Sequence, residues 1–176
     1  MQKANFIILS LLFITATAFV TPVTTNWTID NKYSIKFTAG ENKGTLRGLK
    51  GTIQFDENDM AGSVFNVTFD VNTIDLGDEE RTNQAKEKDW LDAANHPTIG
   101  FTSSAFIKTA KGFEVRGHLK IKGISKDMSF PFTFTKKTKA GVFKGAFTIY
   151  AADYKISNEG IGEEIKINFT IPVKES

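Results

Sequence analysis

The chain has 176 residues, of which 40% are hydrophobic and 24% charged, the balance of an ordinary globular protein rather than a disordered or fibrous one. Its 22 Lys and Arg against 20 Asp and Glu give a net charge of +2, too weak a field to favour a nucleic-acid partner. Cysteine is absent, which excludes disulfides, thiolate metal sites and a cysteine nucleophile. The 16 phenylalanines, against 3 tyrosines and 2 tryptophans, carry far more aromatic hydrocarbon than aromatic hydrogen-bonding capacity.

Residues 1–18 have the pattern of a secretory signal peptide. Lys3 supplies the positive charge, an apolar segment covers residues 6–14, and a small-residue cleavage pattern ends at Ala18. The apolar segment is shorter than the roughly 20 residues that cross a membrane as a helix, so we expect no stable membrane insertion; an uncleaved anchor is the alternative. We predict cleavage near Ala18 and a single mature domain over residues 19–176. Exported eukaryotic domains usually carry disulfides, whereas this chain has no cysteine. The expected location is therefore the bacterial periplasm or the secreted fraction.

From Trp27 onward, apolar and polar residues alternate as in antiparallel strands with one buried and one solvent-facing side. The alternation is clearest over residues 65–71, 113–122, 130–134 and 165–173, and weaker over 27–38, 45–56, 98–107 and 142–151. Turn-forming residues separate these segments at 41–44, 57–59, 111–112 and 139–141. The pattern predicts an all-β fold of about eight strands joined mostly by hairpins. Since closure removes exposed strand edges, we expect an eight-stranded antiparallel barrel, with a two-sheet sandwich as the alternative.

One segment, at about residues 79–92, departs from the alternation. It is polar and rich in helix-forming residues, and Asp78 before it is a suitable N-cap. Trp90 and Leu91 lie at its end, and Pro97 prevents a helix from continuing. We predict a short helical insertion that lies as a flap across the barrel mouth or packs Trp90 into the core.

The apolar faces of the strands indicate what the barrel could hold. An eight-stranded barrel is just wide enough to be filled by side chains or to hold one small ligand. Phenylalanines spread over seven predicted strands would line much of the interior, and the gaps between rigid rings suit a flexible hydrocarbon chain. Gly117 and Gly145 would leave room where such a chain passes. The expected ligand-binding residues are Phe37, Phe55, Phe69, Trp90, Leu91, Phe101, Leu119, Ile121, Phe132, Phe147 and Phe169.

Several motifs follow one another in a recognisable order. They are Trp27-Thr28-Ile29-Asp30, Val71-Asn72-Thr73-Ile74-Asp75, Trp90-Leu91-Asp92, His96-Pro97-Thr98-Ile99-Gly100-Phe101 and the most specific, residues 115–124. Together they resemble the YceI-like, polyisoprenoid-binding family over nearly the whole mature chain. The chain departs from the family pattern at Tyr33, at residues 82–85, and at Ala151 and Lys155.

The resemblance implies a lipocalin-like barrel in an exported bacterial protein. Such a protein would hold a long isoprenoid, a fatty-acyl lipid or a similar amphiphile, for sequestration or transport. The expected partner is therefore an amphiphilic lipid, with no nucleic acid. Formation of a homodimer is left open by the sequence.

No constellation of residues indicates catalysis, which requires a nucleophile, base or metal-bound water held in a defined geometry. His96 precedes a proline in a predicted loop, and His118 lies on the polar side of a predicted strand. Asp75, Asp78 and residues 79–80 lack the ligand spacing and glycine of a calcium loop. We predict a binding protein that is not an enzyme and has no metal or cofactor.

Two other interpretations use the same alternation. An outer-membrane barrel would turn the apolar sides toward lipid, but Lys120, Lys122, Lys126 and Lys166 would then crowd a narrow lumen with like charge. A ligand-free envelope interaction or stress module would follow if side chains filled the barrel completely.

Overall fold

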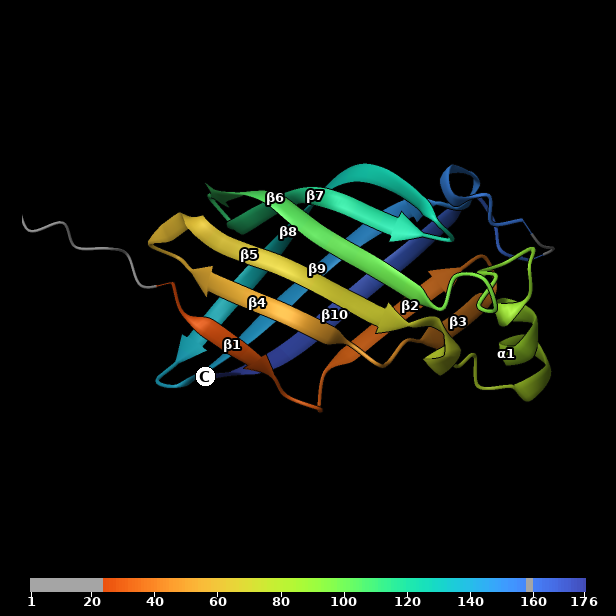
Figure 1. Cartoon of the computed structure of the whole chain (residues 1–176), viewed down its shortest axis with the longest axis horizontal. Helices are drawn as coiled ribbons and strands as arrows, with labels where there is room; N and C mark the ends of the chain where they lie inside the picture. Colours follow the sequence, from red (N-terminus) through yellow and green to blue (C-terminus); the bar gives the residue numbers. More distant parts are fainter. Residues whose placement is uncertain (1–23, 158–159) are drawn as a thin grey trace, which may run out of the picture.

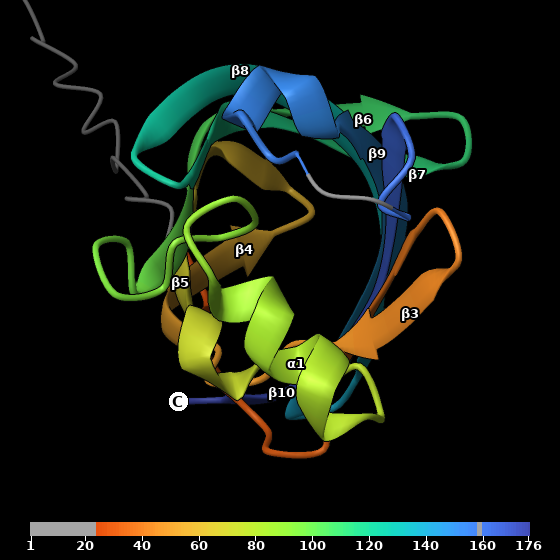
Figure 2. The same ribbon diagram turned by 90° about the vertical axis from the view of Figure 1, so that its right-hand side faces the viewer.

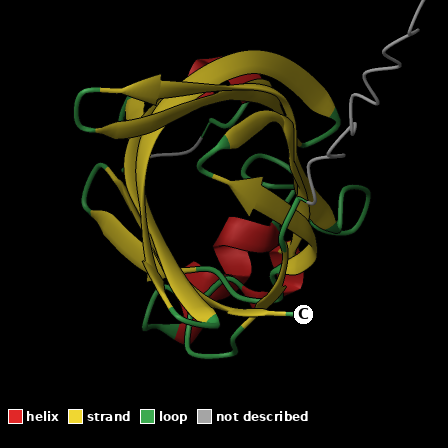
Figure 3. Cartoon of the chain, turned by 90° about the vertical axis from the view of Figure 1, so that its left-hand side faces the viewer, coloured by secondary structure: helices red, strands yellow, loops and turns green. Residues whose placement is uncertain are grey.

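The strands with alternating apolar and polar residues pair mostly with the strands next to them in sequence, and pairing of the first strand with the last closes the sheet into a barrel. The structure is a computed structural model that describes residues 24–157 and 160–176, so the predicted signal peptide lies outside the described residues. Eight antiparallel strands form the closed ring, which Figures 1 and 3 show from the side and from one end. In ring order they are β1 (Asn26–Ile29), β4 (Lys50–Asp56), β5 (Asp59–Asp70), β6 (Thr98–Thr109), β7 (Gly112–Ile121), β8 (Ile124–Lys137), β9 (Ala140–Tyr150) and β10 (Glu164–Glu175). The prediction of an eight-stranded antiparallel barrel is confirmed.

Two further strands extend the wall beside β10. The strand predicted over residues 27–38 is interrupted at residues 30–33, where Asp30 Oδ1 accepts a hydrogen bond from the Lys32 N–H at 3.0 Å. Its second part, β2 (Ser34–Ala39), pairs with the first half of β10, while β1 pairs with the end of β10. β3 (Asn42–Thr45) then pairs with β2.

The turn predicted over residues 41–44 was wrong by about two residues. The reversal occurs at Gly40 and Glu41, where Gly40 has φ +60°, and β3 begins directly afterwards. A left-handed backbone is the conformation that glycine adopts without steric cost. Pro131 of β8 pairs with Glu114 of β7, and the β8–β9 ladder begins directly after it, at Phe132. Proline has no N–H to donate to such a ladder.

The helical insertion is shorter than predicted. α1 covers Glu79–Lys86, and the Asp78 side chain caps it by accepting from the Arg81 N–H at 2.9 Å, as expected. The chain then turns back, because the Leu91 N–H donates to the Ala85 carbonyl at 3.3 Å instead of continuing the helical series. Short 3₁₀ turns follow β5 at Val71–Thr73 and β9 at Ala151–Tyr154. Within the described residues, no helix has the length and apolar character required to span a membrane.

The barrel end farthest from α1 is filled by aromatic rings, which we call the plug. Phe55 is fully buried at its centre and packs against six other phenylalanines at centroid distances of 5.1 to 6.2 Å. Most of these pairs are edge-to-face or tilted, the arrangements that the ring quadrupole favours. The plug consists of Trp27, Phe55, Phe65, Phe106, Phe113, Phe132, Phe134 and Phe143. Burying one phenylalanine contributes about 1.5–3 kcal/mol, so the plug is a principal source of stability.

Candidate functional site

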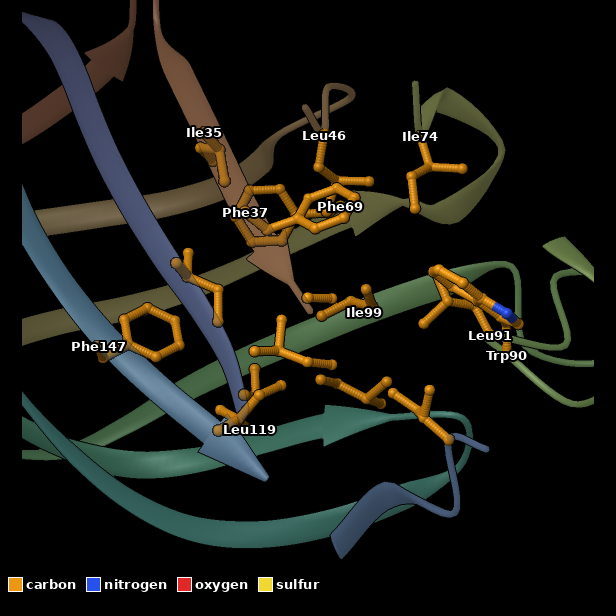
Figure 4. Close-up of a pocket in the computed structure, with 16 residues that line it drawn as sticks. Ile35, Phe37, Leu46, Phe69, Ile74, Trp90, Leu91, Ile99, Leu119 and Phe147 are labelled. Carbon is orange, nitrogen blue, oxygen red and sulfur yellow. The ribbon is translucent and has the colours of Figure 1, made fainter. Parts of the chain in front are cut away.

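The barrel half nearest α1 is hollow. It holds a cavity with an empty volume of about 800 Å³, which includes the space open to solvent at the mouth. Figure 4 shows its labelled side chains pointing from different strands and loops toward a common interior. All sixteen lining residues are apolar: Ile35, Phe37, Ala39, Leu46, Phe69, Ile74, Trp90, Leu91, Ile99, Leu119, Ile121, Phe147, Ile149, Ile156, Ile165 and Ile167.

The two-residue period of the strands builds this wall. On β10, Ile165 and Ile167 face the cavity, while the intervening Lys166 is exposed on the outer surface. On β7, Leu119 and Ile121 do the same. Because alternate side chains of a strand point to opposite faces, a wet exterior and a dry interior arise from the same segment. The apolar sides of the strands thus face inward.

Two segments of chain frame the mouth of the cavity. The first mouth segment, residues 87–97, brings Trp90 and Leu91 into the cavity wall; the second, residues 151–157, brings Ile156. In Figure 2, which views the barrel from the α1 end, α1 and the 3₁₀ turn of the second segment lie on opposite sides of the barrel end. Trp90 lines the cavity and is also only 5% exposed. The two alternatives predicted for this segment, a flap at the barrel mouth and a Trp90 packed into the core, are therefore both realised.

The mouth segments are joined by hydrogen bonds to each other and to the β7–β8 turn. The Ser157 N–H donates to the Asp89 carbonyl at 3.0 Å. The Lys122 ammonium donates to the Lys155 carbonyl at 2.8 Å and to the Asp89 carbonyl at 3.3 Å, and therefore bridges both segments. Among the described residues, the Trp90 indole N–H is the one buried side-chain polar group without a hydrogen-bond partner.

The titratable groups lie outside the cavity wall. His118 Nδ1 lies 2.7 Å from Asp127 Oδ1, and both side chains are exposed on the barrel exterior. His96 Nε2 lies 3.9 Å from Asp92 Oδ2. Burial, together with the nearby Asp153 carboxylate, raises the pKa of Tyr154 to about 12. In the described part of the chain, no three His, Asp or Glu side chains come together as a metal site would require.

Seven of the eleven predicted ligand-binding residues line the cavity: Phe37, Phe69, Trp90, Leu91, Leu119, Ile121 and Phe147. Phe55 and Phe132 instead lie within the plug. Phe101 and Phe169 lie outside the cavity lining. Phe169 packs directly against the cavity-lining Phe147 at 6.4 Å, and Phe101 contacts Phe130, which stacks on Phe147.

The expectation that Gly117 and Gly145 leave open room for a ligand chain was wrong. A Cβ atom at position 117 would collide with the Phe101 ring, and one at 145 with the Phe169 ring. The space above Gly145 is therefore occupied by the Phe169 ring, and the space above Gly117 by the Thr102 carbonyl oxygen together with the Phe101 ring.

Most of the aliphatic wall was not predicted from the sequence. The nine overlooked lining residues are Ile35, Ala39, Leu46, Ile74, Ile99, Ile149, Ile156, Ile165 and Ile167. The available signal was position along the β9–β10 pair: Ile149, Ile165 and Ile167 lie toward the α1 end, whereas Phe143, Ile171 and Val173 lie toward the plug. Weighting phenylalanine alone obscured that gradient.

Comparison with known sequences gives a family match and partial matches to curated relatives. The model of the YceI-like domain matches residues 27–173. Protein YceI of Escherichia coli is 30% identical over 86 residues, which are 49% of this chain and 45% of that protein. UPF0312 protein YE1254 of Yersinia enterocolitica is 29% identical over 92 residues, 52% of this chain and 48% of that protein. The chain thus spans about half the length of the curated relatives it matches.

Several solved structures have the same fold, and this chain matches them over nearly their whole length. BcnA of Burkholderia cenocepacia is 26% identical with a TM-score of 0.77, covering 82% of this chain and 99% of that one. The YCEI protein of Campylobacter jejuni is 18% identical with a TM-score of 0.68, covering 96% and 99%. A polyisoprenoid binding domain from Saccharophagus degradans is 12% identical with a TM-score of 0.62, covering 88% and 100%. At these last two identities the likeness shows the fold alone.

Proposed function

Because the chain belongs to the YceI-like domain family, we propose that it is a lipid-binding protein whose barrel shields the hydrocarbon tail of an amphiphile from water. The observation that carries the proposal is the cavity of about 800 Å³ with an entirely apolar lining. Ligand sites in proteins are concave and mostly apolar. A neighbour with the same fold is a polyisoprenoid binding domain, and we take an isoprenoid or fatty-acyl tail as the ligand class.

The apolar lining determines how an amphiphile would be oriented. A polar head group placed among Ile99, Leu119 and Ile167 would meet no hydrogen-bond partner, at a cost of about 2–7 kcal/mol. The head group therefore lies at the mouth, between the two mouth segments, and the tail points toward the plug. Burial of about 15 methylene groups would contribute roughly 12 kcal/mol, against an association cost of about 4–15 kcal/mol. Hydrocarbon alone can supply useful affinity.

The biological role that we propose is sequestration or transport of this lipid, without a catalytic step. The signal-peptide pattern of residues 1–18 supports action in the bacterial periplasm or after secretion. A lipid held inside one barrel needs no second subunit, so this role is compatible with a monomer as well as with a homodimer.

The direct test is native mass spectrometry of protein purified from its own host without detergent, followed by organic extraction. We expect a bound species that extracts as a lipid with a long hydrocarbon tail. Protein that is folded but carries no lipid, and binds none on addition, would favour the ligand-free interaction module instead.

Intrinsic tryptophan fluorescence provides a second test of ligand binding in the cavity. The two tryptophans lie in different halves of the barrel, so replacing each in turn gives a matched pair of variants. Trp90 lines the cavity, whereas Trp27 packs in the plug against Phe134 at 5.1 Å. Titration with geranylgeraniol, a C20 isoprenoid alcohol, should change the emission of wild type and of Trp27→Phe. The change should be absent in Trp90→Phe. An equal response in both variants would place the probe outside the cavity.

A further inference from the structure

We propose that Phe101, Phe130 and Phe169 form a floor across the barrel that sets the maximum length of hydrocarbon tail the cavity accepts. This inference rests on the proposed lipid-binding function and adds a specificity determinant to it. The three residues lie on β6, β8 and β10, and we refer to them as the floor.

The floor lies between the cavity and the plug. Along β10, Ile167 lines the cavity, Phe169 follows two residues later, and Val173 is buried toward the far end. The partners on β9 follow the same order: Phe147 opposite Ile167, then Gly145 opposite Phe169. Each step of two residues descends one layer on the interior face of the strand. Ile167 and Phe147 are thus the deepest cavity-lining residues of this strand pair, and the layer that contains Phe169 lies directly beneath them.

The floor rings are seated on glycines. Phe169 covers Gly145 of the adjacent strand, and Phe101 covers Gly117, so closely that a Cβ atom at either glycine would collide with the ring. Small residues beside large ones allow side chains to fill a narrow barrel interior. The glycines therefore let the rings lie across the interior instead of standing away from the wall.

Phe130 joins the other floor residues into one layer. Its ring centroid lies 5.1 Å from that of Phe101 and 5.9 Å from that of Phe169. It also stacks on the cavity-lining Phe147 at 4.7 Å. Phe130 is buried, and rings from three different strands close the interior through it. A tail that enters from the mouth meets this layer before it reaches the plug.

The volume above the floor limits the tail. If each carbon group takes roughly the 30 Å³ of a liquid water molecule, the cavity holds at most about 27 of them, and fewer once open space at the mouth is discounted. Within that limit, each added methylene should tighten binding about fourfold. Beyond it, added carbons stay in water and affinity reaches a plateau.

The experiment measures this plateau with lysophosphatidylcholines of increasing acyl-chain length, each kept below its micelle concentration and monitored by tryptophan emission. Phe169→Ala removes a floor ring and should move the plateau to longer chains. Ile167→Phe adds a ring directly above the floor and should move it to shorter chains. Phe113→Ala makes the same truncation inside the plug, where Phe113 packs on Phe55 at 5.1 Å, and should leave the plateau in place.

The outcomes separate the floor from the proposed function. A plateau that moves to longer chains in Phe169→Ala and to shorter chains in Ile167→Phe supports the floor. Affinity that rises without a plateau, or a plateau that neither variant moves, overturns the floor while leaving lipid binding intact. Wild-type protein that binds no chain of any length overturns both. Because Ile167→Phe enlarges a side chain, the test stands even if Phe169→Ala fails to fold.

Discussion

Phe69 and Phe132 illustrate how depth in the barrel decides what a phenylalanine does. Both face the interior, but Phe69 lines the cavity and Phe132 packs in the plug against Phe55 at 5.4 Å. From the sequence alone, both residues are predicted to contact the ligand. Their chemistry is identical, and only the position along the strand distinguishes a ring that faces empty space from one that faces other rings.

A charged residue at these two positions should therefore have different effects. Phe69→Asp places its carboxylate beside a cavity that water can enter, so we expect a folded, less stable protein that has lost bound lipid. Phe132 is 3% exposed, and Phe132→Asp would bury an unpaired charge at a cost of several kcal/mol, enough to prevent folding. Circular dichroism and native mass spectrometry would measure fold and lipid for both variants. Full lipid retention in folded Phe69→Asp would contradict the assignment of the cavity.

Tyr154 makes the stability depend on alkaline pH. Burial first, and the Asp153 carboxylate second, raise its pKa to about 12, compared with about 10 in an unfolded chain. The folded state therefore holds the phenol proton more tightly than the unfolded state does. This contribution to stability is complete below pH 10 and is lost as the pH rises from about 10 to 12.

We expect the free energy of unfolding of wild type to fall more steeply above pH 10 than that of Tyr154→Phe. Urea unfolding of both proteins at pH 9 and at pH 11 would measure the difference, and the comparison cancels the titration of lysines common to both. Parallel losses in the two proteins would show that Tyr154 is not the group responsible.

At the scale of elements, the mouth is built from loops that are hydrogen-bonded across the barrel opening. α1 ends at Lys86, and the turn after it, with Asp92 at φ +51°, returns Trp90 and Leu91 to the cavity wall. The second mouth segment contributes Ile156 from the other side. The Ser157 N–H bonds the second segment directly to the Asp89 carbonyl of the first, so a ligand that widens the mouth as it enters would have to break this hydrogen bond and separate the two segments.

Lys122 should control the rate of that separation. Lys122→Met keeps most of the aliphatic stem but removes the ammonium that bonds to the Asp89 and Lys155 carbonyls. A net loss of about 1 kcal/mol would make opening, and hence lipid release, roughly fivefold faster. Stopped-flow transfer of a fluorescent fatty acid to acceptor vesicles would measure it. Lys120→Met, an exposed lysine on the same hairpin, is the control, and equal release rates in the two variants would argue against the bridge.

At the scale of the whole molecule, one continuous barrel has two interiors. The plug supplies stability through ring–ring packing, and the cavity keeps apolar surface available for a ligand. The same strands enclose both the plug and the cavity: β10 pairs with β2 near the cavity and with β1 at the opposite end, which closes the barrel. Strands anchored in the plug can thus hold the cavity walls in place even though the cavity itself is not filled by side chains.

The sequence by itself determined the alternating antiparallel strands, the short helix capped by Asp78, and the shared apolar strand faces on which residues such as Leu119 and Ile167 lie. Alternation and capping act between near neighbours, so they are legible in the chain. Which interior residues meet was decided by the tertiary structure, because register and barrel closure set the depth of every side chain. Gly145 looks like open space in the sequence, yet the Phe169 ring fills it from a strand more than twenty residues away. The division into cavity, floor and plug depends on such contacts between strands, which local pattern does not encode.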